Sequence, residues 1–243
     1  MQQLLIGREQ EKHTLENALS SAKPELVALI GRRRVGKTYL VKHTYQQRID
    51  FELTGLQRAT KPEQLQNFLF AFKKYFPDLS IDKRPKNWLD AFFILTTALE
   101  DKNRKEKIVV FLDELPWLGT KRSGFITALG WFWNSWAINQ HIVVVICGSV
   151  ASWMIEEVIN DKGGLHNRVT KQLYIEPFTL RETEAFLKAQ HIHLSRYHIV
   201  QLYLTMGGIP MYLDQVEAGL SAIQNIQRIC FQRNGYLLSL IHI

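Results

Sequence analysis

One octet constrains the fold more than any other part of the chain: GRRRVGKT, at residues 31–38, fits the pattern G-x-x-x-x-G-K-T. The apolar run ELVALI (25–30) precedes it, and KTYLVKHTYQQ (37–47) continues from it with the composition of a helix. In a strand–loop–helix of this kind, the glycines allow a tight turn whose backbone N–H groups point at phosphates, and the helix adds the positive end of its dipole. The octet therefore predicts a P-loop, in which Lys37 reaches the β- and γ-phosphates and the Thr38 hydroxyl ligates Mg²⁺.

Two carboxylates follow a second apolar run, IVVFL (108–112). A P-loop site needs a carboxylate at the end of a neighbouring strand to hold the magnesium shell, and Asp113 fits this role. Glu114 stands one residue farther along, where a carboxylate can polarise an attacking water. Acidic pairs are also common on solvated strand ends, but the P-loop favours the functional interpretation.

A third apolar run, IVVVIC (142–147), ends in Gly148 and Ser149. The carboxyl ends of parallel strands lie at the edge of the sheet where ligands bind. Ser149 is therefore predicted to form a hydrogen bond with the γ-phosphate or with the water that Glu114 holds. Ser149 is equally suited to cap a helix formed by ASWMIEEV (151–158), and both roles can hold together.

The remaining patterns predict an α/β core followed by helices. Strands are expected at 25–31, 49–55, 107–115 and 141–149, and helices at 37–47, 61–76, 87–101, 123–139, 179–190, 195–206 and 211–232. Continuous β-branched runs are typical of strands buried on both faces of a parallel sheet, and the alternation of strands with helices favours such a sheet covered by helices. We divide the chain into an α/β core at 1–178 and a small helical lid subdomain at 179–243.

Composition describes an ordinary globular chain and argues against several classes of protein. Hydrophobic residues make up 46% of the 243 residues and charged residues 22%. No apolar run is long enough to span a membrane, and the first residues lack the pattern of a signal peptide, so a cytoplasmic protein without a membrane partner is expected. Two cysteines, Cys147 and Cys230, without clustered Cys or His ligands, support neither a disulfide nor structural zinc.

The basic residues are concentrated in the octet. Of the formal net charge of +7, residues 31–38 carry +4, which leaves +3 for the rest of the chain. Basicity therefore gathers where a polyanionic nucleotide would bind. This distribution leaves a nucleic-acid partner open without supporting one.

Six motifs occur together in a fixed order between Ile6 and Leu213: IGREQE, GRRRVGKT, VVFLDELPWL, ICGS, GGLHNR and GGIPMYL. In this set the chain resembles the archaeal-type ATPases, which belong to the STAND class of AAA+-related P-loop NTPases. The resemblance implies ATP binding, ATP hydrolysis and a requirement for Mg²⁺. It also implies an AAA+/STAND-like α/β fold with a helical lid.

The resemblance assigns further roles. Ile6, Gly7 and Arg8 match a segment near the adenine, Ser149 matches a sensor position, and Arg168 matches an arginine that senses or stabilises the γ-phosphate in cis or from a neighbouring subunit. Gly208 and Pro210 match a turn of the lid that packs against the nucleotide. The expected nucleotide-binding set is Ile6, Gly7, Arg8, Gly31, Arg32, Arg33, Arg34, Val35, Gly36, Lys37, Thr38, Tyr39, Gly208 and Pro210, and the expected catalytic set is Lys37, Glu114, Ser149 and Arg168.

Structural alternatives exist for three of these assignments. Arg8 is alternatively a surface residue at the start of a helix, and Arg168 a solvated loop residue. Gly208 and Pro210 alternatively form a plain turn between helices. Members of the family usually continue past the lid into a winged helix, whereas this chain ends in the apolar YLLSLIHI (236–243), so we expect a truncated C-terminus.

The leading functional hypothesis is a Mg²⁺-dependent ATPase that couples ATP binding and hydrolysis to a conformational switch. The alternatives are a switch that holds ATP or ADP without turnover and a nucleic-acid-associated ATPase. A small-molecule kinase is less favoured because kinases rarely need a glutamate after the magnesium-binding aspartate. A GTPase is disfavoured because no N-K-x-D motif is present. Self-association or a protein partner is compatible with each.

Three consecutive arginines, Arg32, Arg33 and Arg34, stand inside a loop that works mainly through backbone N–H groups. We expect at least one of them to meet an acidic group of the lid or of another subunit. The alternative is that all three lie on a solvated surface.

Overall fold

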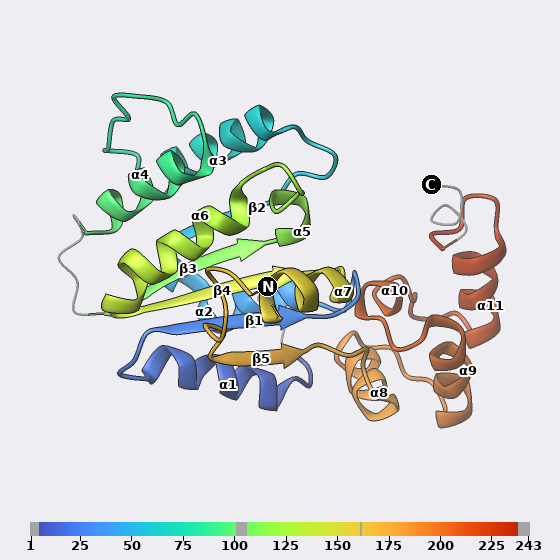
Figure 1. The fold of residues 1–243 in the computed structure, drawn as a ribbon. Helices are drawn as coiled ribbons and strands as arrows, with labels where there is room; N and C mark the ends of the chain where they lie inside the picture. Colours follow the sequence, from blue (N-terminus) through green and yellow to red (C-terminus); the bar gives the residue numbers. More distant parts are fainter. Residues whose placement is uncertain (1–4, 101–105, 161, 238–243) are drawn as a thin grey trace. The chain divides into compact units, whose positions relative to one another are not determined.

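The computed structural model describes residues 5–100, 106–160 and 162–237. Five parallel strands form one sheet in the order β2-β3-β4-β1-β5 (Figure 1). The strands are β1 (Glu25–Ile30), β2 (Phe51–Thr54), β3 (Ile108–Asp113), β4 (Ile142–Gly148) and β5 (Lys171–Tyr174). The predicted α/β fold with a helix-flanked parallel sheet is confirmed.

The described residues group into two compact units. The sheet unit comprises Gln10–Arg32 and Lys37–Tyr174, and the helical unit comprises the described residues of Met1–Glu9, Arg33–Gly36 and Ile175–Ile243. The division of the chain at 178/179 remains a prediction from sequence. No helix among the described residues has the length and apolar content that crossing a membrane would require.

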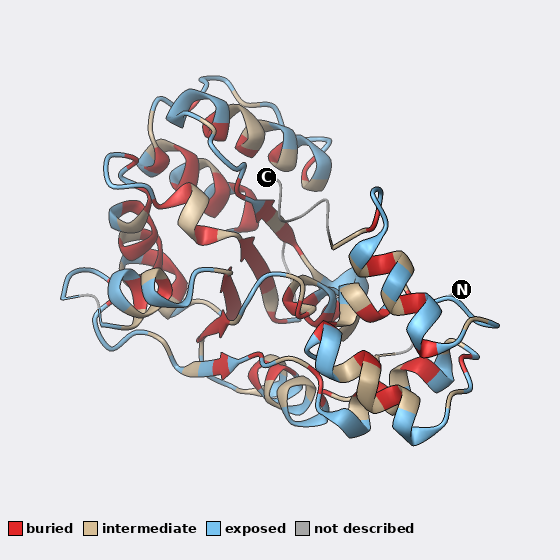
Figure 2. Cartoon of the chain, turned by 90° about the vertical axis from the view of Figure 1, so that its right-hand side faces the viewer, coloured by how far each residue is buried: buried red, intermediate tan, exposed pale blue. Residues whose placement is uncertain are grey.

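Helices cover both faces of the sheet, which explains the uninterrupted apolar runs. Every residue of β1 and β4 is buried, and most strand residues have the red colour of buried residues in Figure 2. In Figure 1, α3, α4 and α6 lie on one face and α1 on the other. The helices of this unit are α1 (Glu9–Ser20), α2 (Lys37–Tyr45), α3 (Lys61–Tyr75), α4 (Trp88–Glu100), α5 (Leu115–Leu118), α6 (Phe125–Trp131) and α7 (Ala151–Met154), with a short 3₁₀ turn at Gln46–Arg48.

The helix predicted at 123–139 is present but irregular. It begins as α6, continues as a π-helical segment, Phe132–Trp136, and ends in a 3₁₀ turn, Ala137–Asn139. Its apolar side chains Phe125, Leu129, Phe132 and Trp136 are all buried. A second π-helical segment, Ile155–Ile159, extends α7.

Strand β5 was not predicted, because its sequence KQLY lacks an apolar run. It lies at the edge of the sheet and pairs with β1 from Val27↔Lys171 to Ile30↔Tyr174. Leu173 is buried, whereas the Tyr174 side chain is 52% exposed. An edge strand needs little apolar content, so the sequence signal was weak.

The helical unit contains α8 (Leu180–Ala189), α9 (Arg196–Met206), α10 (Pro210–Leu213) and α11 (Ala222–Ile226), followed by a π-helical segment, Gln227–Phe231. Its core is formed by Phe178, Leu187, Ile192, Ile199, Leu202, Met206, Leu213, Val216, Ala222 and Ile229. The prediction of a single helix at 211–232 is wrong. The chain leaves the helical conformation after Leu213, turns through Gly219 at φ 86°, and starts again where Ser221 and Gln224 form a capping box.

Gly208 gives a test of packing in this unit. It has φ +65°, its carbonyl accepts a hydrogen bond from the Phe178 N–H at 2.8 Å, and an added Cβ would lie 2.2 Å from the Phe178 carbonyl oxygen. Gly207 has the same φ with nothing within 4 Å of such a Cβ. We expect Gly208→Ala to lower the free energy of unfolding by about 3 kcal/mol or more, and Gly207→Ala by only about 1–2 kcal/mol. Urea unfolding measures both, and equal losses would contradict the contact.

Candidate functional site

The P-loop connects the buried β1 to α2, as its pattern predicts. β1 ends at Ile30 and α2 begins at Lys37. Within the loop, Arg34 has φ 72° and Gly36 has φ 91°. An added Cβ on Gly36 would meet nothing within 4 Å, so the left-handed backbone, rather than lack of space, requires glycine there.

The Lys37 side chain folds back over its own loop. Its Nζ donates hydrogen bonds to the carbonyl oxygens of Gly31 at 2.7 Å and Arg32 at 2.8 Å. Only 6% of Lys37 is exposed. The two carbonyl groups therefore fix the position of the Lys37 ammonium group beside the first residues of the loop.

Thr38 and Asp113 meet although 75 residues separate them in sequence. The Thr38 hydroxyl donates to Asp113 Oδ2 at 2.6 Å, and Asp113 Oδ1 accepts the Glu114 N–H at 2.9 Å. Asp113 is buried. Cys147 lies in the neighbouring strand, and burial, with a contribution from Asp113, raises the pKa of its thiol well above the usual value. Cys147 is therefore a neutral buried thiol and unsuited to act as a nucleophile.

The oxygen atoms of Thr38 and Asp113 fit Mg²⁺ better than a softer metal. Mg²⁺ prefers oxygen ligands and is usually bound by one or two carboxylates together with substrate phosphates. Within residues 5–100, 106–160 and 162–237, no group of three or more His, Cys, Asp or Glu side chains could hold a metal ion. The donor set thus suits a metal that the protein holds jointly with a nucleotide.

Glu114 and Ser149 form a second pair at the same edge of the sheet. The Ser149 hydroxyl donates to Glu114 Oε2 at 2.8 Å. Glu114 has φ 51°, so the chain turns sharply as it leaves β3. The N-cap of α7 is Val150, without a side-chain cap, so the prediction that Ser149 caps this helix is wrong.

Arg8 is buried, so its interpretation as a surface residue is wrong. Its guanidinium lies 5.1 Å from the centroid of the Phe178 ring and donates to the carbonyl oxygens of Val35, at 3.4 Å, and Glu176. Its backbone N–H donates to Glu182 at 3.4 Å. An added Cβ on Gly7 would overlap the Glu182 carboxylate. Ile6–Gly7–Arg8 is therefore built into the helical unit and holds the carbonyl of a P-loop residue.

The three arginines of the loop differ from one another. Arg32 and Arg33 are exposed, whereas Arg34 is partly buried. The Arg34 guanidinium donates to the Tyr212 hydroxyl at 3.3 Å and lies 5.6 Å and 5.9 Å from the ring centroids of Tyr212 and Tyr236. For Arg34, these partners are aromatic rather than the acidic group that we expected.

Arg168 lies in a turn before β5 and is exposed. Two residues later, the Thr170 N–H donates to the Leu26 carbonyl at 2.8 Å. Leu26 stands near the amino end of β1, whereas the P-loop follows its carboxyl end. The structure therefore brings Lys37, Thr38, Asp113, Glu114 and Ser149 together, but it does not bring Arg168 to them within one chain.

The same loop contains a close approach that the sequence reading missed. Gly164 packs against Gly130 of α6, and an added Cβ on either glycine would lie 3.1 Å from the Cα of the other. The Asn134 side-chain amide donates to the Gly164 carbonyl at 2.5 Å. The second glycine of GGLHNR, Gly164, thus has a packing role. In the sequence, only Gly130 in the helix predicted at 123–139 hinted at this contact.

Pro210 begins α10, and Gly208 contacts Phe178 within the helical unit. Tyr39, which also belongs to the predicted nucleotide-binding set, lies in α2 beside His43; the two rings are tilted, with centroids 5.8 Å apart. Burial raises its pKa. These residues have structural partners, and their contact with a nucleotide remains a prediction.

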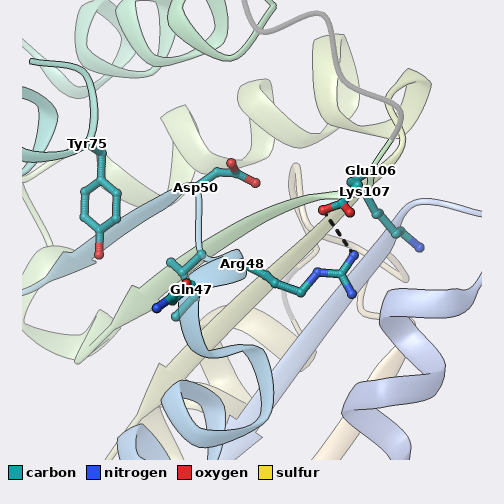
Figure 3. A pocket seen from close by; sticks show the side chains of 7 residues that line it. Gln47, Arg48, Asp50, Tyr75, Glu106 and Lys107 are labelled. Atoms are coloured by element: carbon teal, nitrogen blue, oxygen red, sulfur yellow. Dashed lines mark hydrogen bonds and ion pairs between the residues drawn. The ribbon is translucent and has the colours of Figure 1, made fainter.

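A hollow in the sheet unit lies away from these residues (Figure 3). It is lined by Gln47, Arg48, Ile49, Asp50, Tyr75, Glu106 and Lys107, at the amino ends of β2 and β3. The Lys107 ammonium donates to the carbonyl oxygens of Ala18, Ser21 and Lys23 at 2.6–2.9 Å. This lysine closes the C-terminal end of α1, so its role is structural.

Parallel-sheet topology, a P-loop after β1 and carboxylates at the end of β3 define the P-loop ATPase class. A family model described as an ATPase domain predominantly from Archaea matches residues 5–216. The chain belongs to this family, which confirms the resemblance predicted between Ile6 and Leu213.

Two relatives match most of this chain. An uncharacterized protein of Methanocaldococcus jannaschii is 26% identical over 88% of this chain and 44% of its own length. An uncharacterized ATP-binding protein of the same organism is 29% identical over 93% and 73%. The chain thus spans less than half of the first relative.

Two solved structures share the fold. A Walker-type ATPase of Pyrococcus abyssi has a TM-score of 0.63 at 20% identity, over 87% of this chain and 66% of that one. A STAND protein with a tetratricopeptide repeat sensor from Pyrococcus horikoshii has a TM-score of 0.54 at 16% identity, over 98% and 34%.

Proposed function

We propose that the chain binds ATP and hydrolyses it in a Mg²⁺-dependent reaction that drives a conformational switch. The observation that carries the proposal is the convergence of two hydrogen-bonded pairs, Thr38–Asp113 and Ser149–Glu114, beside the P-loop lysine. The strand order explains it: β4 lies between β1 and β3, so the residues after these three strands meet at one edge.

Each residue has a chemical task in this proposal. The N–H groups of the P-loop and the Lys37 ammonium bind the phosphates, and the oxygens of Thr38 and Asp113 hold Mg²⁺. The metal, when bound, supplies positive charge that offsets the charge of the phosphates. Glu114 orients a water and accepts its proton, while the Ser149 hydroxyl fixes the direction of the Glu114 carboxylate. Membership of an ATPase family and a relative described as ATP-binding support adenine as the base.

The direct test is to measure nucleotide binding and phosphate release by the purified chain, with and without Mg²⁺. We expect binding of ATP and ADP, and release of phosphate only when Mg²⁺ is present. Binding without turnover would contradict hydrolysis and favour a switch that only holds the nucleotide. Absence of binding would contradict the whole proposal.

Arg168 is proposed to act on the nucleotide of another copy of the chain, because its placement near the amino end of β1 makes a role in its own site unfavourable. An arginine that acts on the transition state contributes roughly 10³–10⁵ in rate in this class of enzymes. We expect Arg168→Ala to lower turnover far more than ATP affinity.

A mixing experiment tests the origin of this arginine. Arg168→Ala and Glu114→Gln chains, each inactive alone, are expected to regain activity when mixed, since one supplies the glutamate and the other the arginine. No recovery at any ratio would contradict action between copies, and normal turnover by Arg168→Ala alone would remove its catalytic role.

A further inference from the structure

Arg34 of the P-loop has two aromatic partners, Tyr212 and Tyr236. Its guanidinium lies within 6 Å of the ring centroids of both Tyr212 and Tyr236 and donates to the Tyr212 hydroxyl at 3.3 Å. The two rings are themselves in an edge contact, with centroids 6.3 Å apart. A cation within this distance of an aromatic ring is attracted to it, so the two tyrosine rings bind the Arg34 side chain.

The backbone conformation of Arg34 indicates that its contact with the two tyrosines has a function. With φ 72°, Arg34 occupies the left-handed region, which is unfavourable for a residue with a long side chain. Such a conformation persists only where the surroundings enforce it. The next residue, Val35, is buried, and its carbonyl accepts a hydrogen bond from Arg8. The turn of the P-loop is thus held by two arginines, Arg34 through the tyrosines and Arg8 through the Val35 carbonyl.

We propose that Arg34 is a positioning residue that fixes the phosphate-binding turn by binding Tyr212 and Tyr236, so that nucleotide affinity depends on two tyrosines of the helical unit. This inference rests on the proposed function, because the turn matters to affinity only if its N–H groups bind phosphates. α10 orients Tyr212: Pro210 begins the helix, and the Tyr212 N–H donates to the Ile209 carbonyl at 2.9 Å.

In this proposal the charge of Arg34 acts on the tyrosine rings and not directly on the phosphates. A guanidinium that acted simply as a cation near phosphate would lose its effect when its charge is removed, whatever happens to the tyrosines. A guanidinium that positions the loop also loses its effect on affinity when the tyrosine rings that bind it are removed. The tyrosine variants therefore separate the two roles, since they leave every charge of the loop in place.

The experiment is a double-mutant cycle read by calorimetric titration of ADP with Mg²⁺, a ligand that avoids turnover. The variants are Arg34→Asn, because asparagine tolerates the left-handed region, Tyr212→Ala, and both together. Each single variant is expected to weaken ADP binding roughly five- to thirtyfold, the range for one cation–π contact with its hydrogen bond. The double variant is expected to bind ADP no more weakly than the single variant with the lower affinity, because both substitutions remove the same contact.

Two conservative variants and two controls sharpen the result. Tyr212→Phe keeps the ring, and Arg34→Lys keeps the charge and a donor, so each is expected to recover part of the lost affinity. Arg181→Ala removes an exposed arginine of α8, and Tyr197→Ala removes a tyrosine that is 70% exposed; both are expected to bind ADP like the unaltered chain. Urea unfolding of each variant without nucleotide identifies any that fail to fold.

The outcomes separate this inference from the proposed function. If the unaltered chain binds ADP and Tyr212→Ala binds it equally well, the positioning role is overturned while ATP binding stands. The positioning role would also be overturned if the fold-losses of ADP affinity of the two single variants multiplied in the double variant, because the two residues would then act independently. If the unaltered chain does not bind ADP, the proposed function itself fails, and this inference fails with it.

Discussion

Replacement of Glu114 by glutamine is expected to lower the rate of ATP hydrolysis by about 10²–10⁴-fold, the usual contribution of a general base. Glutamine has nearly the same shape, and its side-chain oxygen can still accept the hydrogen bond that the Ser149 hydroxyl donates at 2.8 Å. It cannot accept a proton from water at neutral pH. ATP affinity is therefore expected to change little, and the effect should fall on turnover at saturating ATP.

Phosphate release and ATP binding are to be measured on the same protein preparations. Glu156→Gln is the matched control, because it removes the same charge from an exposed position of the π-helical segment that follows α7. Ser149→Ala is expected to lower turnover less, by roughly tenfold, since it removes the group that orients Glu114 but leaves the base. Turnover by Glu114→Gln at the rate of the unaltered chain would show that another group activates the water.

The parts of the site that were predictable from sequence share one property: they follow strands that are visible as apolar runs. β1, β3 and β4 are buried almost throughout, and the parallel arrangement brings the residues after them to one edge. The meeting of Thr38 with Asp113, and of Glu114 with Ser149, follows from this rule. The alternation of strands and helices sufficed to predict the sheet.

The parts that were not predictable depend on contacts between segments without a local signal. β5 exists because it pairs with β1, although its own residues are mostly polar. Arg8 is buried where Phe178, Glu176 and Val35 receive its guanidinium. Arg34 contacts Tyr212 and Tyr236, which follow it in the sequence by 178 residues or more. Charge alone suggested an acidic partner for at least one of the three loop arginines, but a planar guanidinium also stacks well on aromatic rings.

Replacement of Lys37 by methionine is expected to weaken the binding of ATP and ADP by roughly 100-fold. Methionine preserves most of the length and apolar volume of the stem but removes the ammonium that the Gly31 and Arg32 carbonyls hold at the loop. Each charge-assisted hydrogen bond contributes about 1.5–3 kcal/mol, and about 2.7 kcal/mol corresponds to a 100-fold change in the dissociation constant.

The matched control for this variant is Lys42→Met in the same helix. The Lys42 ammonium is 2.6 Å from the Glu52 carboxylate, but its side chain is 49% exposed, so the pair contributes at most about 1 kcal/mol to stability and nothing to the loop. Calorimetric titration of ADP with Mg²⁺ measures both variants, and urea unfolding checks that they fold. If Lys37→Met bound ADP as tightly as Lys42→Met, the P-loop lysine would not bind phosphate. The N–H groups of the loop would then bind the phosphates without a buried cation of the octet, because Lys37 is the only buried cation among residues 31–38.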